Sequence, residues 1–184
     1  MRARDARPEA VVHAGLASVS AFGRGMRRIV RGRRDPRGEA DVSLLIDAPP
    51  AAVWDVLAHG AGYGDWVLGA NPVLEVDDDW PAVGSSLHYS VGVGPIEVRD
   101  RTTVRRSVPA EELDLDIVAW PLGSVRVLIR LEARSSMTLV HLDEHPGGGP
   151  LRWVHTPLGS AGFAARGTVM LRRLRDLVET PSIG

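Results

Sequence analysis

Residues 42–66 read VSLLIDAPPAAVWDVLAHGAGYGDW, and this stretch decides the fold. Apolar side chains alternate with others over residues 42–47, which predicts a first β-strand. Pro49 and Pro50 then suit the first turn of a helix, where missing N–H groups cost nothing. Apolar residues at helical spacing give this helix one apolar face, and a glycine-rich segment leads into one more helical turn. A strand followed by two short helices predicts a sheet that is gripped by helices around an apolar cavity.

From there to about residue 146, the apolar residues repeat with a period of two, as in strands that bury one face. We expect six further strands, at residues 73–76, 85–93, 96–106, 112–120, 124–133 and 137–144. The connections between them are short, which indicates antiparallel neighbours in chain order. Residues 146–150, PGGGP, are expected to form a loop, and an apolar stripe over about 157–179 predicts a long final helix.

Charged residues on three of these strands support the same order. They lie on one face, and in chain order they are Arg99, Arg101, Arg105, Asp114, Asp116, Arg126 and Arg130. If neighbours in sequence are neighbours in the sheet, an acidic strand lies between two arginine-bearing strands. Each such cross-strand pair contributes roughly 0.2–1 kcal/mol. The opposite face is almost purely apolar, so we expect one solvated and one dry face.

Composition limits the functions that the chain can have. It contains no cysteine and no lysine, which excludes disulfides, thiolate chemistry and Schiff bases. Residues 1–40 hold ten arginines against four acids, whereas residues 41–184 hold twelve against nineteen, so nucleic acid is not an expected partner. We divide the chain into a flexible basic extension, residues 1–40, and one folded domain, residues 41–180. No signal peptide and no run of about 18 apolar residues is found, so a cytoplasmic location is expected.

A set of short motifs resembles a known superfamily. The motifs are Ala48-Pro49-Pro50 with Val53-Trp54, Trp66, Val83-Gly84-Ser85, Asp143-Glu144, Gly149-Pro150 and the segment Arg166 to Leu174. Residues 41–180 resemble the START/Bet v 1-like (SRPBCC) superfamily, in its polyketide cyclase/dehydrase-like branch. The resemblance implies an α+β helix-grip fold, in which a seven-stranded antiparallel sheet curves around a long C-terminal helix, with two short helices after the first strand. It also implies an internal cavity for a hydrophobic small molecule.

Three residues are candidates for chemistry in that cavity. Asp100 lies in phase with the dry face of its strand, where desolvation suits a carboxyl to general acid or base work. A bulge that turns it outward, or an arginine partner from the last helix, is the alternative. Glu144 would orient a ligand at the cavity mouth, or cap a helix, or form a salt bridge with Arg166. Tyr89 would hydrogen-bond a ligand, or satisfy a buried partner while it packs.

A larger set of residues would line the cavity and contact the ligand. Its members are Trp66, Leu87, Tyr89, Val98, Thr102, Leu115, Ile117, His141, Trp153 and Met170. The face on which His141 lies stays open, because residues 137–144 are apolar in both phases. Trp66 and Trp153 would stack on a flat ligand or simply pack. The scattered histidines and the missing phosphate-binding motifs lead us to expect neither a metal nor a cofactor.

Three functions fit these features. The first is binding of a lipid- or polyketide-like small molecule in the internal cavity. The second is a polyketide cyclase or dehydratase, in which Asp100 removes a proton next to a carbonyl while Tyr89 or Glu144 orients that carbonyl. The third is a lipid carrier whose residues 1–40 dock weakly on a membrane or an acidic partner. Whether the chain is an enzyme stays open at this point.

Overall fold

The computed structural model describes residues 29–31, 40–93, 96–119, 123–148 and 157–180. Within these ranges the chain forms one antiparallel sheet of eight strands in the order β1-β2-β8-β7-β6-β5-β4-β3. The strands are β1 Ile29–Arg31, β2 Ala40–Ile46, β3 Val73–Val76, β4 Ser86–Val93, β5 Ile96–Val108, β6 Glu112–Ala119, β7 Gly123–Arg134 and β8 Met137–Gly148. The helices are α1 Pro50–Ala58, the 3-10 turn η1 Gly60–Gly62, α2 Tyr63–Trp66 and α3 Pro157–Glu179.

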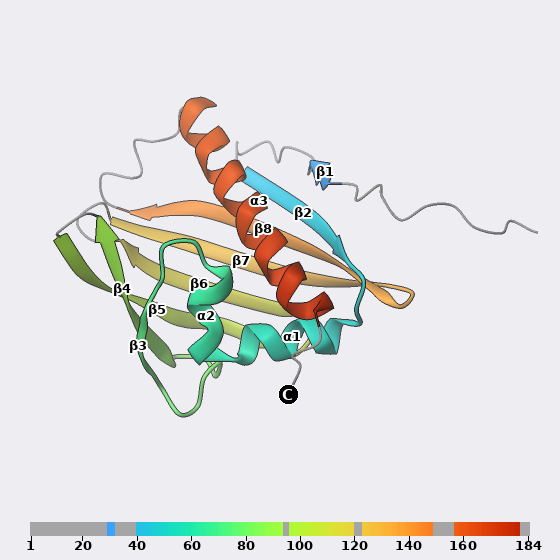
Figure 1. Ribbon diagram of the computed structural model, residues 1–184, viewed down its shortest axis with the longest axis horizontal. Helices are drawn as coiled ribbons and strands as arrows, with labels where there is room; N and C mark the ends of the chain where they lie inside the picture. Colours follow the sequence, from blue (N-terminus) through green and yellow to red (C-terminus); the bar gives the residue numbers. More distant parts are fainter. Residues whose placement is uncertain (1–28, 32–39, 94–95, 120–122, 149–156, 181–184) are drawn as a thin grey trace, which may run out of the picture.

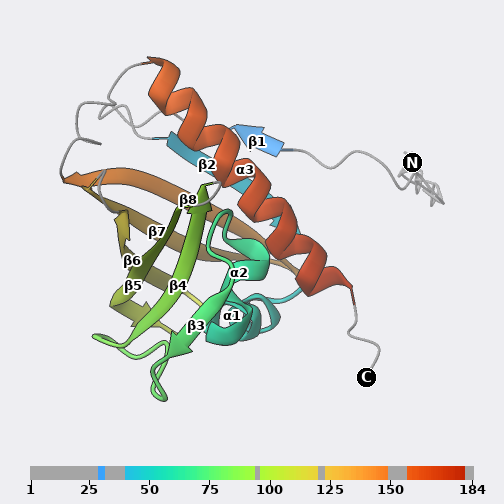
Figure 2. The same cartoon turned by 60° about the vertical axis from the view of Figure 1, so that its left-hand side comes forward.

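The long helix α3 lies diagonally across one face of the sheet (Figure 1). It packs mainly on β2, and it also contacts α2, α1 and β8. Figure 2 shows the curvature of the sheet, with β3 and β4 in front of β5 to β8. The predicted α+β helix-grip fold is therefore confirmed, and the core lies between the concave face of the sheet and the helices.

The inner faces follow the alternation of the sequence. In β2, Val42, Leu44 and Ile46 are buried against α3, whereas Leu45 between them is exposed. Helix α3 approaches this part of the sheet closely at Gly167, where an added Cβ would lie 2.8 Å from Val42 Cγ2 and 2.9 Å from Leu142 Cδ2. A larger residue at Gly167 would push the helix away from the sheet.

The strand count and one strand end differ from the expectation. The seven predicted strands are present as β2 to β8, and β1 adds an eighth at the edge by pairing antiparallel with β2, Ile29 opposite Leu44. This strand comes from within residues 1–40, which we expected to lie outside the fold. Strand β8 runs on to Gly148 rather than ending before a loop at residue 146. Pro146 is accommodated because it pairs with Val125 at a register shift, where a missing N–H is tolerated.

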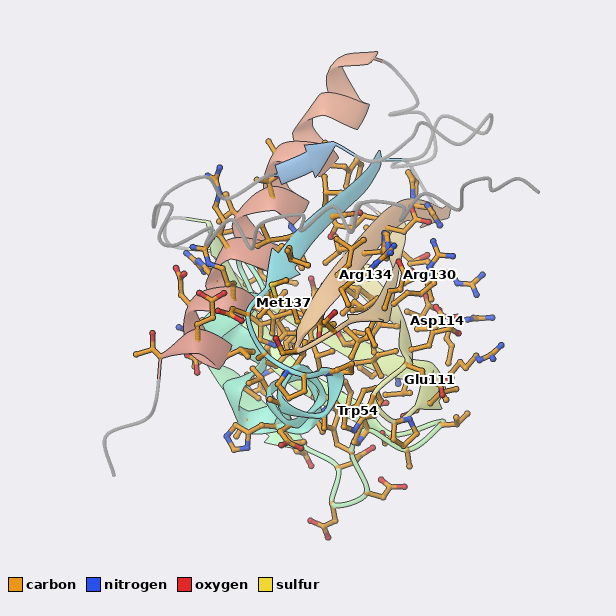
Figure 3. All side chains as sticks on the ribbon, turned by 90° about the vertical axis from the view of Figure 1, so that its right-hand side faces the viewer. Trp54, Glu111, Asp114, Arg130, Arg134 and Met137 are labelled. Atoms are coloured by element: carbon orange, nitrogen blue, oxygen red, sulfur yellow. The ribbon has the colours of Figure 1, made fainter. Side chains whose placement is uncertain are left out.

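The outer face of the sheet carries the predicted charge ladder. The guanidinium of Arg126 donates to both carboxylate oxygens of Asp114, at 2.9 and 2.6 Å. Glu112 lies 3.0 Å from Arg106, and Asp116 lies 3.8 Å from Arg105. Figure 3 shows Asp114 and the nearby Arg130 on the side of the sheet away from α3. The cross-strand charge argument, and with it the order of β5, β6 and β7, is confirmed.

Both described edges of the sheet are short. At one edge β3 has four residues and a register shift between Val73 and Glu75, and at the other β1 has three residues. Residues 1–28 and 32–39, most of the predicted basic extension, lie outside the described residues, as does Trp153. Among the described residues, no helix has both the length and the apolar character needed to cross a lipid bilayer.

Candidate functional site

Polar side chains gather in the interior between the sheet and α3, in a setting that is otherwise apolar. We call this group the interior polar cluster; its members are Tyr63, Trp66, Tyr89, Asp100, Thr102, Glu144 and Arg166. All are buried except Arg166, which is half-buried. The buried apolar residues of the same interior include Leu87, Leu115, Ile117 and Met170. Buried polar groups in an apolar interior need partners, and their partners define what the site can do.

Helix α2 supplies two aromatic members of the cluster. Its single turn is possible because Gly64 has no side chain, since an added Cβ would lie 2.3 Å from the carbonyl oxygen of Ala70. The tight turn directs the rings of Tyr63 and Trp66 inward, with centroids 5.3 Å apart in an edge-to-face arrangement. The Tyr63 hydroxyl shares a hydrogen bond of 3.1 Å with the Thr102 hydroxyl, in which either group can donate.

Strands β4 and β5 bring Tyr89 and Asp100 together as directly opposite residues on the inner face. The Tyr89 ring lies 5.8 Å from that of Tyr63. Burial raises the pKa of Tyr63 far above its ordinary value, and the neighbouring Tyr89 adds to this. Burial also raises the pKa of Tyr89, helped by the charge of Asp100 and opposed by the hydrogen bond with Thr102 and by Arg166. Both phenols therefore stay protonated and are able to donate hydrogen bonds.

The pair formed by Glu144 and Arg166 closes the cluster on the α3 side. Glu144 lies within β8, four residues before the strand ends at Gly148, with 2% of its surface exposed. Arg166 Nη1 donates to Glu144 Oε1, and Arg166 Nη2 donates to the carbonyl oxygen of Leu68 at 3.2 Å. Burial raises the pKa of Glu144, and the charges of Arg166 and His145 offset part of that rise. The close approach of α3 at the next residue, Gly167, brings the guanidinium within reach.

Two atoms of the cluster have no hydrogen-bond partner among the described residues. They are the indole Nε1 of Trp66 and the carboxylate Oε2 of Glu144. Leaving a buried donor or acceptor unpaired costs about 1–3 kcal/mol, and such groups are rare in native proteins. The interior polar cluster thus keeps one donor and one acceptor available for a group that the described part of the chain does not supply.

Most of the predicted site residues meet in this interior. The structure places there Trp66, Leu87, Tyr89, Val98, Asp100, Thr102, Leu115, Ile117, Glu144 and Met170. Asp100 is 7% exposed on the inner face, so the alternative of a bulge that turns it outward is wrong. The alternative of a salt bridge between Glu144 and Arg166 is confirmed. The catalytic and ligand-binding roles of these residues remain predictions.

His141 is not brought to the interior, and its place in the predicted ligand-binding set is corrected. Val140 and Leu142 face α3, so the alternation of the strand turns His141 to the outer face. There its Nδ1 lies 2.8 Å from Ser43 Oγ, and its Nε2 lies 3.5 Å from a carboxylate oxygen of Glu132. The sequence does not show on which face His141 lies, because both faces of β8 are apolar.

Two members of the cluster were missed as site residues. Tyr63 lies on a helix of one turn, which is too short to show periodicity. Arg166 entered the sequence analysis only as a partner for Glu144. A usable signal existed for Tyr63, since it is one of only two tyrosines in the chain and stands three residues before Trp66.

The hollows of the described structure bear on the expected internal cavity. Of two hollows lined by described residues, neither is a ligand-sized chamber between the sheet and α3. The larger, about 590 Å³, is an open basin on the outer face, lined in part by Arg106, Arg130 and His141. The smaller, between β2 and α3, holds about 10 Å³, which is near the limit for one water molecule. An internal cavity for a ligand therefore remains a prediction.

An antiparallel sheet that curves around a long C-terminal helix, with buried polar groups set in an apolar interior, defines the class of helix-grip, START/Bet v 1-like proteins. The comparison with protein families agrees. A family model described as polyketide cyclase / dehydrase and lipid transport matches residues 37–179. The chain belongs to this family, and membership favours binding of hydrophobic ligands. No curated protein matches the chain.

Solved structures with the same fold share little sequence with this chain. DynU16, a protein of the dynemicin biosynthetic locus, is 19% identical with a TM-score of 0.57 over 79% of this chain, which spans about half (48%) of DynU16. CalU16 from Micromonospora echinospora is 17% identical with a TM-score of 0.54, over 84% of this chain and 85% of CalU16. A protein from Arthrobacter aurescens is 15% identical with a TM-score of 0.62, over 84% of this chain and 94% of its own. These identities show a shared fold alone.

Proposed function

We propose that this protein binds a hydrophobic small molecule in the interior, with the polar end of that molecule against the interior polar cluster. The observation that carries the proposal is the unpaired donor of Trp66 and the unpaired acceptor of Glu144 in one apolar interior. A chain that needed only stability would gain by replacing either group with an apolar one. Their presence supports a partner that arrives with the ligand.

The family description and the neighbours indicate the kind of molecule. The description includes both polyketide and lipid chemistry, and DynU16 belongs to a biosynthetic locus. A lipid- or polyketide-like compound combines an apolar body with a few oxygen atoms, which suits this interior. Because the hollows described above include no chamber of that size, we expect α3 to shift away from the sheet when the ligand enters.

The experiment uses two adjacent residues of β6 that face opposite ways. Ile117 is 6% exposed toward the interior, and Val118 is 38% exposed on the outer face. Compounds that co-purify with the full chain are extracted and identified by mass spectrometry, and binding of an apolar fluorescent dye is titrated. We expect Ile117→Phe to weaken dye binding by filling the interior and Val118→Phe to leave it unchanged. Equal dye binding by both variants, with no co-purified compound, would refute interior binding.

A second candidate function is catalysis as a polyketide cyclase or dehydratase. The arrangement that favours it is Asp100 directly opposite Tyr89 on the inner face, with a carboxylate next to a phenol that stays protonated. Asp100 would remove a proton next to a carbonyl, and Tyr89 or Glu144 would orient that carbonyl. Asp100→Asn is expected to abolish turnover of a poly-β-ketone substrate while apolar dye binding persists. Unchanged turnover in this variant would leave the protein as a carrier.

Docking of the basic extension on a membrane or an acidic partner is a third proposal. It is supported by the charge of residues 1–40, ten arginines against four acids. Deleting residues 1–28 spares β1, which pairs with β2. We expect the full chain to bind anionic vesicles in a salt-sensitive manner and the truncated chain to lose that binding. Vesicle binding that survives the truncation would place the contact elsewhere.

A further inference from the structure

We infer that the ligand is a neutral molecule that carries a hydroxyl group beside its apolar body. The hydroxyl donates to Glu144 Oε2, and a ligand oxygen accepts from Trp66 Nε1. This inference rests on the proposed interior binding and names the chemistry that the interior polar cluster selects. It follows from the hydrogen bonds that the cluster already makes, the two atoms that have no partner among the described residues, and the charges in the cluster.

The unsatisfied atoms define the demand on the ligand. Trp66 and Glu144 are 1% and 2% exposed, so bulk water does not reach them. An indole N–H only donates, and an ionised carboxylate only accepts. Other polar groups nearby are occupied, since Tyr63 is hydrogen-bonded to Thr102 and Glu144 Oε1 accepts from Arg166. The ligand must therefore supply one hydrogen-bond acceptor for Trp66 Nε1 and one donor for Glu144 Oε2.

Both atoms belong to one region of the interior. Arg166 connects Glu144 to the carbonyl of Leu68, which follows Trp66 by two residues. The ring of Tyr63 contacts that of Trp66, and the charges of both Arg166 and Glu144 act on the Tyr63 phenol. One end of a small molecule that enters beside Tyr63 thus meets the donor and the acceptor together.

Charge excludes the common alternatives to a hydroxyl. The guanidinium of Arg166 is already paired with the buried carboxylate of Glu144. A carboxylate or phosphate ligand would add a negative charge beside the carboxylate of Glu144, and it would compete with that carboxylate for Arg166. An ammonium group offers donors but has no lone pair for Trp66. A hydroxyl group offers both a proton and lone pairs without charge.

The test compares four probes of nearly equal shape on the full chain. They are 2-naphthol, 2-methoxynaphthalene, naphthalene and 2-naphthoate, with binding measured by calorimetry near neutral pH. A hydrogen bond to a charged group predicts that 2-naphthol binds about tenfold to a hundredfold more tightly than the ether. Naphthoate is expected to bind most weakly. Equal affinity for 2-naphthol and naphthalene would overturn the inference, because it would mean that water satisfies both atoms.

Two variants locate the effect. Glu144→Gln replaces an acceptor with an amide that also donates, so the preference for 2-naphthol over the ether should fall to near unity. Trp66→Phe keeps a ring against Tyr63 and removes an N–H that has no partner among the described residues, so any loss of stability comes from the smaller ring and not from a broken hydrogen bond. The Trp66→Phe substitution should weaken the binding of 2-naphthol several-fold relative to that of naphthalene. Trp80→Phe is the matched control, because the N–H of Trp80 donates to the carbonyl of Leu57 outside the cluster.

The outcomes separate this inference from the proposed function. If none of the four probes binds, interior binding itself is refuted. If the probes bind but Trp66→Phe and Trp80→Phe behave alike, or the ether rivals 2-naphthol in the unmodified chain, the interior binds apolar molecules and the hydroxyl inference is wrong. If Glu144→Gln does not fold, the comparison between Trp66→Phe and Trp80→Phe decides whether the hydroxyl inference is right.

Discussion

Replacing Arg166 with methionine removes the guanidinium that pairs with Glu144 and keeps an apolar stem of similar length. The Glu144 carboxyl is 2% exposed, so water does not compensate the lost cation. Breaking a buried pair by removing one partner costs about 3–5 kcal/mol. We therefore expect Arg166→Met to lower the free energy of unfolding by about that amount near neutral pH. Arg173→Met is the control, because Arg173 lies on the same helix but is exposed, and its loss should cost less than about 0.5 kcal/mol.

The cost should depend on pH in a defined direction. Burial already raises the pKa of Glu144, and loss of Arg166 raises it further. The unfolded chain releases this proton near pH 4.3, whereas the folded variant holds it to higher pH. Between these two pKa values the folded state binds more protons, so stability falls as pH rises and levels off above the folded pKa. The deficit of the variant should be small near pH 4.5 and largest near pH 8.

Urea unfolding followed by tryptophan fluorescence, repeated between about pH 5 and pH 8, measures this profile. The double variant Arg166→Met/Glu144→Leu should recover most of the loss, because an apolar replacement of a whole buried ion pair is often neutral or stabilising. A loss no larger than that of Arg173→Met near pH 8 would contradict the reasoning. So would a deficit that grows toward low pH, since Glu144 would then not be a desolvated carboxyl.

Three further predictions test the packing and the charge ladder. Absorbance at the tyrosinate band should stay flat through pH 10 and rise only with alkaline unfolding, because both tyrosines of the chain are buried with raised pKa values. Gly167→Val should cost about 1–3 kcal/mol in urea unfolding through its clash with the sheet, whereas Gly162→Ala, with open space around it, should stabilise α3 by up to about 1 kcal/mol. In urea unfolding, Asp114→Asn should lower the free energy of unfolding by about 1 kcal/mol and Asp116→Asn by close to nothing. The reason is that Asp114 is buried and accepts two hydrogen bonds from Arg126, whereas Asp116 forms an exposed pair. Equal losses in the two variants would refute this contrast.

The sequence predicted the parts of the fold that local patterns encode. Alternation in β2 separated the buried Val42 and Leu44 from the exposed Leu45, and the same parity placed Asp100 on the inner face. The charge ladder fixed the order of β5, β6 and β7, because complementary residues such as Asp114 and Arg126 must lie on neighbouring strands. These features depend only on the alternation of side chains along one strand and on pairs between neighbouring strands, so the sequence alone predicts them.

The features that the sequence left open depend on partners far apart in the chain. Only the pairing of β8 with β2 turns His141 to the outer face, because its strand is apolar in both phases. The eighth strand, Ile29–Arg31, is too short to show a period. The sequence does not show that the N–H of Trp66 lacks a partner among the described residues, because this depends on which polar groups the fold keeps away from it. The site was thus predicted as a set of inward positions, and its hydrogen-bonding demand emerged only in three dimensions.

The two described margins of the sheet, β1 with three residues and β3 with four residues and a register shift, have a consequence for the molecule in concentrated solution. Open backbone at the rim of a β-layer invites neighbouring copies to add on and grow into fibrils. Here each rim offers too few consecutive amide groups for such stacking to begin. Abbreviated, irregular borders therefore protect a protein whose main layer is otherwise long and rich in valine, leucine and isoleucine.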